Sequence, residues 1–279
     1  MTALTAGAAG GSLGGVSDPR GSATFHAPAQ AYDLFIGRYS RELARALIDA
    51  AGVRPGESAL DVGCGPGGLT AELAAVLGAE RVAAADPSAP FAEACRARAP
   101  GARVEVAPAE ALPFENGAFD HALAQLVVNF MSDAAAGVRE MARVTRAGGV
   151  VSAAVWDYAG EMTLLRRFWD AAVALDPAAA ERDEGRMPFC APGPLGDLWS
   201  GAGLAAVEVS PAVVSAGYDG FGDLWRGLEA GVGPAGAYVA ALPSEARAGL
   251  AAELRRRLGA GDAPFRLTAR AWIATGRVP

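Results

Sequence analysis

Residues 59–68 read Ala-Leu-Asp-Val-Gly-Cys-Gly-Pro-Gly-Gly, and this stretch decides the fold. The apolar run over residues 59–62 predicts a short buried strand, after which Gly63, Gly65 and Gly68 satisfy the pattern G-x-G-x-x-G. Glycines at these positions permit a tight turn and let backbone N–H groups approach a ligand at the start of the next helix. The pattern alone is weak, because dinucleotide sites and other adenosine-ligand sites share it.

Two acidic residues narrow the choice of ligand. Asp86 ends the second expected strand, about 20 residues after the glycine loop, where a carboxylate suits two ribose hydroxyls. Asp61 lies at the mouth of the loop, where it would repel the pyrophosphate of a dinucleotide and attract an ammonium group. An adenosine joined to an amino acid, with ammonium and sulfonium charges, fits both acids. That ligand is S-adenosylmethionine.

Strands and helices are expected to alternate along the first half of the chain. The apolar runs that predict the first five strands lie at residues 59–62, 81–86, 104–106, within 119–130, and 149–156. This alternation predicts a parallel sheet with helices on both faces. The helix before the fifth strand is expected to end at residues 147–149. After Trp156 the pattern turns helix-rich, and two further strands are expected near 204–215 and 265–273.

The length of 279 residues fits one large α/β domain. Residues 1–24 are rich in glycine, alanine and serine and carry almost no charge, which predicts a disordered N-terminal tail. The folded domain is then expected over residues 25–279. Within it, residues 161–194 are expected to form an insertion that caps the substrate.

These motifs together resemble the class I S-adenosylmethionine-dependent methyltransferases, in particular the bacterial small-molecule enzymes related to the ubiquinone and menaquinone type. The resemblance covers about residues 28–279. The segments that carry it are 60–67, Asp86, 109–114 (Ala-Glu-Ala-Leu-Pro-Phe), 119–120 (Phe-Asp) and 146–149 (Arg-Ala-Gly-Gly). The resemblance implies a Rossmann-like, doubly wound sheet of seven mostly parallel strands, with the last strand antiparallel and a helical cap inserted after strand five.

The resemblance also implies which residues meet the ligands. The glycine loop would hold the methionine end of S-adenosylmethionine, the acid after strand two would hold the ribose, and the 109–110 segment would meet the adenine. The residues expected to bind the cofactor are Asp61, Gly63, Gly65, Gly67, Asp86, Pro87, Ala109, Glu110, Gln125 and Arg38. Pro108 stands where relatives often carry an aspartate, and it has neither a side-chain acceptor nor an N–H. The residues expected to bind the substrate are Tyr32, Tyr39, Asn129, Trp156 and Tyr158.

Composition excludes several other functions. All 24 basic residues are arginine, so a pyridoxal Schiff base and a P-loop lysine are impossible. With two histidines and three widely spaced cysteines, no resident metal is expected. The net charge of −7 disfavours a nucleic-acid partner, and no apolar run approaches the length of a membrane helix. The absence of a secretory signal predicts a cytoplasmic protein, and the bias toward Ala, Gly and Arg suggests a bacterial one.

The expected reaction is in-line transfer of the sulfonium methyl to a small organic acceptor, by O-, N- or C-methylation. Because the methyl group is already activated, the protein mainly has to align the acceptor with it. No residue stands out as a general base, and His26 is a weak candidate. The alternatives are a fold of this type repurposed for binding or for another reaction, and an NAD(P)-dependent oxidoreductase. A homodimer is possible.

Overall fold

The computed structural model describes residues 29–279. The expected tail over residues 1–24 and the base candidate His26 lie outside the described residues. The described chain begins with helix α1 (Ala29–Leu34), which leads into α2 (Gly37–Ala51). α2 buries a stripe that includes Leu43 and Leu47, and it is capped by Gly52, whose φ is +69°.

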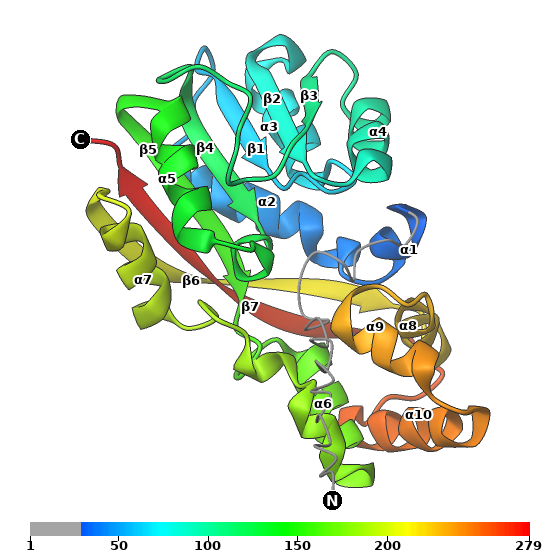
Figure 1. Cartoon of the computed structure of the whole chain (residues 1–279). Coiled ribbons are helices and arrows are strands. Elements are labelled where there is room, and N and C mark those ends of the chain that lie inside the picture. The colour runs from blue at the N-terminus through cyan, green and yellow to red at the C-terminus, as the bar shows by residue number, and fades with distance from the viewer. Residues whose placement is uncertain (1–28) are drawn as a thin grey trace, which may run out of the picture.

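Seven strands form one sheet in the order β3-β2-β1-β4-β5-β7-β6 (Figure 1). The parallel strands are β1 (Ala59–Val62), β2 (Val82–Asp86), β3 (Arg103–Val106), β4 (Phe119–Gln125) and β5 (Thr145–Trp156). β7 (Phe265–Arg277) runs antiparallel to both of its neighbours, β5 and the edge strand β6 (Ala205–Tyr218). The expected sheet of seven mostly parallel strands, with the last strand antiparallel, is therefore confirmed.

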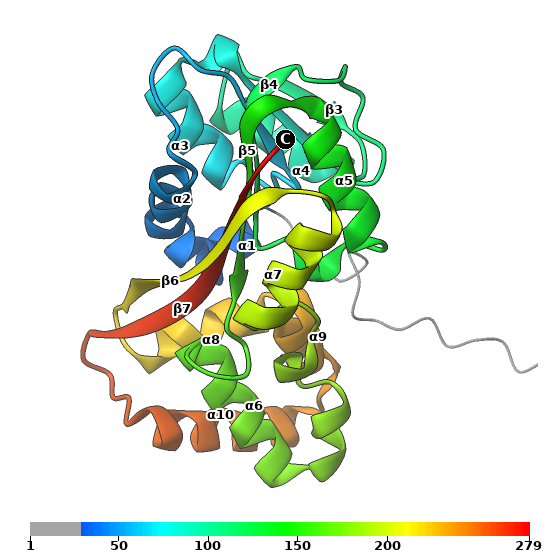
Figure 2. The same ribbon diagram turned by 90° about the vertical axis from the view of Figure 1, so that its left-hand side faces the viewer.

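Helices cover both faces of this sheet. α2 and α3 (Gly68–Leu77) lie on one face, and α5 (Ala134–Val144) and α7 (Pro192–Gly201) lie on the other (Figure 2). α4 (Ala89–Arg98) packs beside α3, next to β2 and β3. Between the layers every residue of β1 and β2 is buried, which explains their short, continuous apolar sequences. Asp61 and Asp86 are the two charged residues of these strands. Both are buried, and both lie in the carboxyl-terminal half of their strand.

The junction of α5 and β5 differs from the expectation. The helix does not run to the glycine pair at residues 148–149; α5 ends at Val144 and β5 begins at Thr145. The glycines lie inside the strand because β5 approaches β4 closely there: a Cβ on Gly149 would lie 2.5 Å from the Asp120 carbonyl oxygen.

Two insertions form a helical cap beyond the carboxyl end of β5 (Figures 1 and 2). The first follows β5 and contains α6 (Thr163–Leu175), η4 (Pro177–Glu181) and η5 (Glu184–Arg186). The second joins β6 to β7 and contains α8 (Phe221–Glu229), α9 (Gly233–Ala241) and α10 (Ser244–Leu258). α6 packs against α10 and α9, so the two insertions share one small core. The sequence placed the cap within residues 161–194, but α7, which begins at Pro192, packs against β6 and β7, and the second insertion supplies much of the cap.

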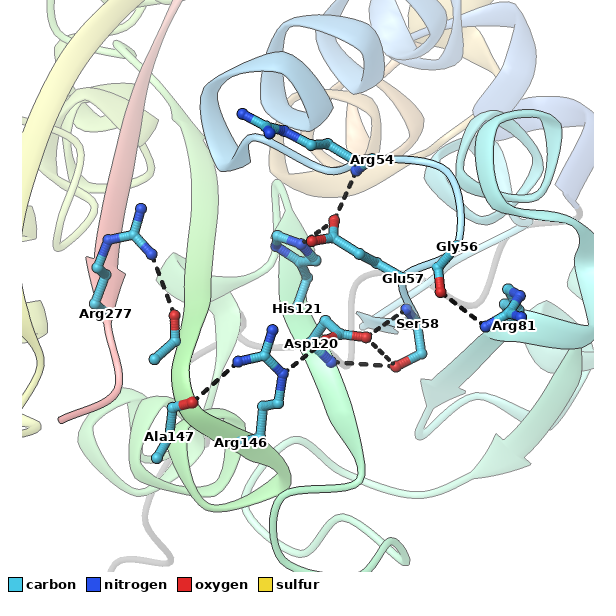
Figure 3. Close-up of polar contacts among 11 residues, drawn as sticks. Arg54, Gly56, Glu57, Ser58, Arg81, Asp120, His121, Arg146, Ala147 and Arg277 are labelled. Carbon is cyan, nitrogen blue, oxygen red and sulfur yellow. Dashed lines mark hydrogen bonds and ion pairs between the residues drawn. The ribbon is translucent and has the colours of Figure 1, made fainter.

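Polar side chains join the amino ends of β1, β4 and β5 (Figure 3). The Asp120 Oδ2 atom accepts hydrogen bonds from the Ser58 backbone N–H at 2.7 Å and from the Ser58 hydroxyl at 2.8 Å. The Asp120 Oδ1 atom accepts from Arg146 Nε at 2.7 Å. His121 belongs to the same cluster, with Nε2 2.9 Å from Glu57 Oε2. Two motifs that are distant in the sequence, residues 119–120 and 146–149, are therefore directly connected.

Replacing Asp120 by alanine is expected to lower the free energy of unfolding by about 2 kcal/mol, because hydrogen bonds to a charged group are lost. Burial raises the pKa of Asp120, but the bonds from Arg146 and Ser58 outweigh it and hold that pKa below its usual range. The stabilisation is therefore present above the unfolded pKa of about 4 and is lost as the pH falls below it. Urea unfolding of wild type and variant, at pH 7 and at decreasing pH, measures both effects.

The matched control is Asp262→Ala. It removes an ion pair of 3.0 Å from a side chain that is 88% exposed, and it should change the free energy of unfolding by less than about 0.5 kcal/mol. A similar loss in both variants would contradict the role given to Asp120.

Candidate active site

A cavity opens at the carboxyl ends of β1, β2 and β4, and we call it the main cavity. It measures about 1050 Å³ up to and including its open mouth. Its walls come from the glycine loop after β1, the turn after β2, and the segments that follow β3 and β4. In open parallel sheets, ligands bind outside the carboxyl ends of the strands where the strand order reverses, which here is between β1 and β4.

The glycine loop lines this cavity in backbone conformations that other residues disfavour. φ is +70° at Gly63 and +50° at Gly65, and a Cβ on Gly63 would lie 2.5 Å from the Val127 side chain. Both glycines line the main cavity, as does Gly68 at the start of α3. Gly67 does not line it. This glycine faces α4 instead, where a Cβ would lie 3.0 Å from the Cα atom of Cys95. The absence of a side chain at Gly67 therefore lets the glycine loop pack closely against α4.

Asp61 is buried beneath the loop with one carboxylate oxygen unsatisfied. Its side chain is 1% exposed, and Oδ2 accepts a hydrogen bond from the Thr70 hydroxyl at 2.6 Å. Its other oxygen, Oδ1, has no hydrogen-bond partner within residues 29–279. Burial raises the pKa of Asp61 to about 7, with a smaller opposing effect of the bond from Thr70. A buried acceptor without a donor is costly, and a cationic ligand group would supply the missing donor.

Gln125, at the end of β4, presents a second acceptor of the same kind. Its Nε2 group donates to the Ser40 hydroxyl at 3.0 Å, which leaves Oε1 buried without a partner in the described part of the chain. Ser40 and Tyr32 line the main cavity beside Gln125. Burial raises the pKa of Tyr32 to about 12, partly offset by a hydrogen bond with Ser40, so the phenol stays protonated.

Asp86 contributes the second carboxylate of the main cavity. It is 6% exposed, Oδ2 accepts from the Gly65 N–H at 2.9 Å, and Oδ1 accepts from the Ser88 N–H at 2.8 Å. Each oxygen keeps a further lone pair for a ligand hydroxyl. Burial raises the pKa of Asp86, and the two backbone bonds oppose that effect.

Pro87, Ala109 and Glu110 line the main cavity after β2 and β3. Glu110 is held in place by its Oε1 atom, which accepts from the Asp133 N–H at 3.1 Å. Pro108 lines the wall beside Ala109 without offering a donor. Of the ten residues expected to bind the cofactor, the structure thus gathers eight around one cavity, and Gly67 and Arg38 are the two outside it.

Arg38 is engaged elsewhere. Its guanidinium group donates to the Leu34 carbonyl at 2.7 Å and to Asp223 Oδ1 at 2.8 Å, and it stacks over the Tyr218 ring at 5.0 Å. It therefore ties α2 to β6 and α8, and it does not line the main cavity. The expectation that Arg38 meets the cofactor does not fit this geometry.

A smaller cavity of about 400 Å³ adjoins the main cavity, and we call it the inner chamber. Tyr32, Leu126 and Phe130 line both. The inner chamber is also lined by Trp156, the last residue of β5, and by Tyr158 just after it. Residues 232–235 and Glu184 of the cap line its other side. Three of the five residues expected to bind substrate, namely Tyr32, Trp156 and Tyr158, therefore line it.

The other two expected substrate residues lie in the core. Tyr39 is fully buried, with its hydroxyl 3.1 Å from that of Tyr218 and its ring packed edge-on against Trp156. Asn129 is buried and donates from Nδ2 to the Met187 sulfur at 3.2 Å. Neither lines the main cavity or the inner chamber.

Sequence reasoning missed two residues that shape the site. Leu126 has a φ of +63°, a strained conformation for a leucine, and this places it in the wall between the two cavities. Nothing in its sequence context signals a positive φ. Glu184 is 4% exposed although it lies in a polar stretch of the sequence that is typical of a surface loop.

The described residues contain no cluster of three or more His, Cys, Asp or Glu side chains that could hold a metal ion. Within the same residues, none of the helices has the length and apolar character needed to cross a membrane. The arrangement suits an organic ligand that brings a cationic group to Asp61 and Gln125 and hydroxyl groups to Asp86.

Comparison with known proteins agrees with this geometry. Residues 60–153 match the family model described as a methyltransferase domain. The chain is 40% identical over 105 residues to a demethylmenaquinone methyltransferase of Beutenbergia cavernae, covering 38% of this chain and 43% of that relative. It is 32% identical over 150 residues to a malonyl-[acyl-carrier protein] O-methyltransferase of Pseudescherichia vulneris, covering 54% and 58%. The chain thus spans about half the length of these curated relatives.

A solved structure extends the likeness to most of the chain. The phosphoethanolamine N-methyltransferase 2 of Haemonchus contortus, in complex with phosphomonomethylethanolamine and S-adenosylhomocysteine, superposes with a TM-score of 0.56 at 16% identity. The match covers 90% of this chain and 57% of that one, and at this identity it shows the shared fold. Residues 60–153 therefore match a methyltransferase domain, and the chain shares the fold of the class I S-adenosylmethionine-dependent methyltransferases.

Proposed function

We propose that this protein transfers the sulfonium methyl group of S-adenosylmethionine to a small organic acceptor. The observation that carries the proposal is the pair of buried, unpartnered acceptors, Asp61 Oδ1 and Gln125 Oε1, on residues that line the main cavity. An α-ammonium group would supply donors to both. A dinucleotide would instead bring a pyrophosphate toward the Asp61 carboxylate, which disfavours the oxidoreductase alternative.

The other residues of the main cavity fit the rest of this cofactor. Asp86 would accept hydrogen bonds from the ribose hydroxyls, and Ala109 and Glu110 would lie toward the base. S-adenosylmethionine supplies an activated methyl group when bound, and the protein aligns the acceptor with it and keeps water away. The glycine loop lets the backbone approach the ligand without side chains in the way.

The acceptor would occupy the inner chamber, which opens beside Leu126 next to the main cavity. Its apolar lining supports a small molecule, as do the printed activities of the two curated relatives. The two curated relatives are bacterial, which supports a bacterial source, and a cytoplasmic location stays a prediction. The net charge of −7 disfavours a nucleic-acid substrate. A homodimer stays a prediction. A protein of this fold with a binding role or another reaction would still bind the cofactor, but it would form no S-adenosylhomocysteine.

Asp86→Ala is expected to weaken the binding of S-adenosylhomocysteine by about 1–3 kcal/mol, because hydrogen bonds from the ribose to a carboxylate are lost. Calorimetric titration of wild type and variant with S-adenosylhomocysteine, and separately with NADP⁺, measures this. Asp197→Ala, on the exposed surface of α7, is the matched control and should bind like wild type. Preference for NADP⁺ over S-adenosylhomocysteine in the wild type would overturn the proposed function.

Asp61→Asn is expected to remove two opposite effects of pH, one on stability and one on binding. Because the folded pKa of Asp61 is raised to about 7, the stability that its neutral form contributes is present below about pH 4 and is lost as the pH rises to about 7. The protein without ligand should therefore lose stability relative to Asp61→Asn between pH 4 and pH 7. S-adenosylhomocysteine should bind the wild type more tightly over the same rise, since the carboxylate pairs with its ammonium group.

Urea unfolding and calorimetric titration at pH 5 and pH 8 measure the two effects of Asp61→Asn, with Asp197→Asn as the control. If the affinity of Asp61→Asn changes with pH as much as that of the wild type, Asp61 is not the partner of the ammonium group.

A further inference from the structure

The inner chamber is built mainly from aromatic rings. Tyr32, Phe35, Phe130, Trp156 and Tyr158 line it, together with short apolar side chains of the cap. No arginine lines it within the described part of the chain, so an acceptor carboxylate or phosphate would find no cationic partner there. Flat, apolar walls of this kind favour a planar ring as the occupant.

Glu184 is the one carboxylate that lines this chamber within residues 29–279. It is 4% exposed, and its Oε2 atom accepts a hydrogen bond from the Trp169 indole N–H at 2.9 Å. The bond from Trp169 involves only Oε2, and no ion pair joins Glu184 to another described residue. The nearest cation, Arg166, is already bound to Asp170 and Asp183. One oxygen of Glu184 is thus held in place and the other is available to the chamber.

The ionisation of Glu184 is matched to proton transfer near neutral pH. Burial raises the pKa of Glu184 to about 7, partly offset by the bond from Trp169. The groups that face it do not titrate in that range: burial raises the pKa of both Tyr158 and Cys190, and the pKa of Arg166 is raised by Asp183 despite burial. A base with a pKa near the working pH is the most effective proton acceptor.

We propose that the acceptor is a neutral aromatic molecule bearing a hydroxyl group, and that Glu184 binds this hydroxyl and takes its proton during methyl transfer. The proposal rests on the proposed function. The carbon–sulfur bond of the sulfonium breaks and an oxygen–methyl bond forms, while the hydroxyl proton passes to the Glu184 carboxylate. The products are S-adenosylhomocysteine, the aryl methyl ether and a protonated Glu184, which then releases its proton to solvent. Tyr32, Leu126 and Phe130 line both cavities, so the methyl group would pass beside them.

The test uses the full chain saturated with S-adenosylhomocysteine and two probes, 2-naphthol and its methyl ether 2-methoxynaphthalene. Wild type is expected to bind 2-naphthol at least about tenfold more tightly, because only the naphthol can donate to Glu184. Glu184→Gln should reduce this preference to less than about threefold while its affinity for S-adenosylhomocysteine stays unchanged. The glutamine oxygen can still accept from Trp169, which favours retention of the fold. Glu181→Gln changes an exposed residue in the turn just before Glu184. It is the control and should behave like wild type.

Two further readouts separate a proton acceptor from a structural residue. The affinity of wild type for 2-naphthol should rise between pH 5.5 and pH 8 and that of Glu184→Gln should stay flat. With methyl-labelled S-adenosylmethionine, wild type should form 2-methoxynaphthalene, and Glu184→Gln should form it about 10²-fold to 10⁴-fold more slowly.

Failure of 2-naphthol to bind wild type, an unchanged preference in Glu184→Gln, or no methyl ether from wild type would each overturn the role of Glu184. Failure of wild type to bind S-adenosylhomocysteine would instead overturn the proposed function, so the two failures are distinguishable.

Discussion

Parallel hydrogen bonding of β1 to both β2 and β4 is the constraint on which the rest of the site depends. In this register Asp61 lies opposite Ala84 on one side and Leu123 on the other. Asp61, Asp86 and Gln125 consequently reach the same edge of the sheet from three separate parts of the chain. A slip of one residue would turn each of these side chains to the opposite face. The bonds among Ser58, Asp120 and Arg146 hold the other end of the same strands, and therefore support the site from a distance.

Two acids of the site, Asp61 and Glu184, are buried without a cationic partner, which is electrostatically unfavourable. Asp61 and Glu184 each have one oxygen held by a neutral donor, Thr70 or Trp169, and neither forms an ion pair with a described residue. Burial raises the pKa of both to about 7. Apolar side chains would stabilise these positions better, so the acids fit a role toward ligands more readily than one in folding. One of them suits a cation in the main cavity, and the other suits a hydroxyl in the inner chamber.

The features that could be predicted from the sequence are those with local causes. The apolar runs, the glycine loop and the acids at strand ends are each short segments of sequence. The positions of the first five strands and the roles expected of Asp61, Gly63, Gly65 and Asp86 therefore followed from short-range patterns. The structure confirmed the fold, and residues 60–153 match a methyltransferase domain, while the ligand contacts stay predictions.

The features that escaped prediction depend on contacts between distant segments. Tyr39 and Tyr32 were both expected to bind the substrate. The chain turns between α1 and α2, so the two rings face different surroundings. Arg38 does not line the main cavity because it pairs with Asp223, which lies far along the chain. The second half of the cap comes from the insertion between β6 and β7, and no pattern in the sequence shows that it meets the first. Glu184 lines the inner chamber together with residues 232–235 of that second insertion.

The division of the cap into two insertions has a consequence for how this fold acquires selectivity. Both insertions leave and re-enter the sheet at strand ends, so either can change in length or sequence without altering the strand order. The groups that would hold the cofactor lie on β1, β2, β4 and the segments that flank them, whereas the inner chamber takes Glu184 from one insertion and residues 232–235 from the other. With the proposed function, changes in the two insertions would alter the choice of acceptor while the residues around the glycine loop kept the methyl donor. A new acceptor would then require matched changes near residue 184 and at residues 232–235.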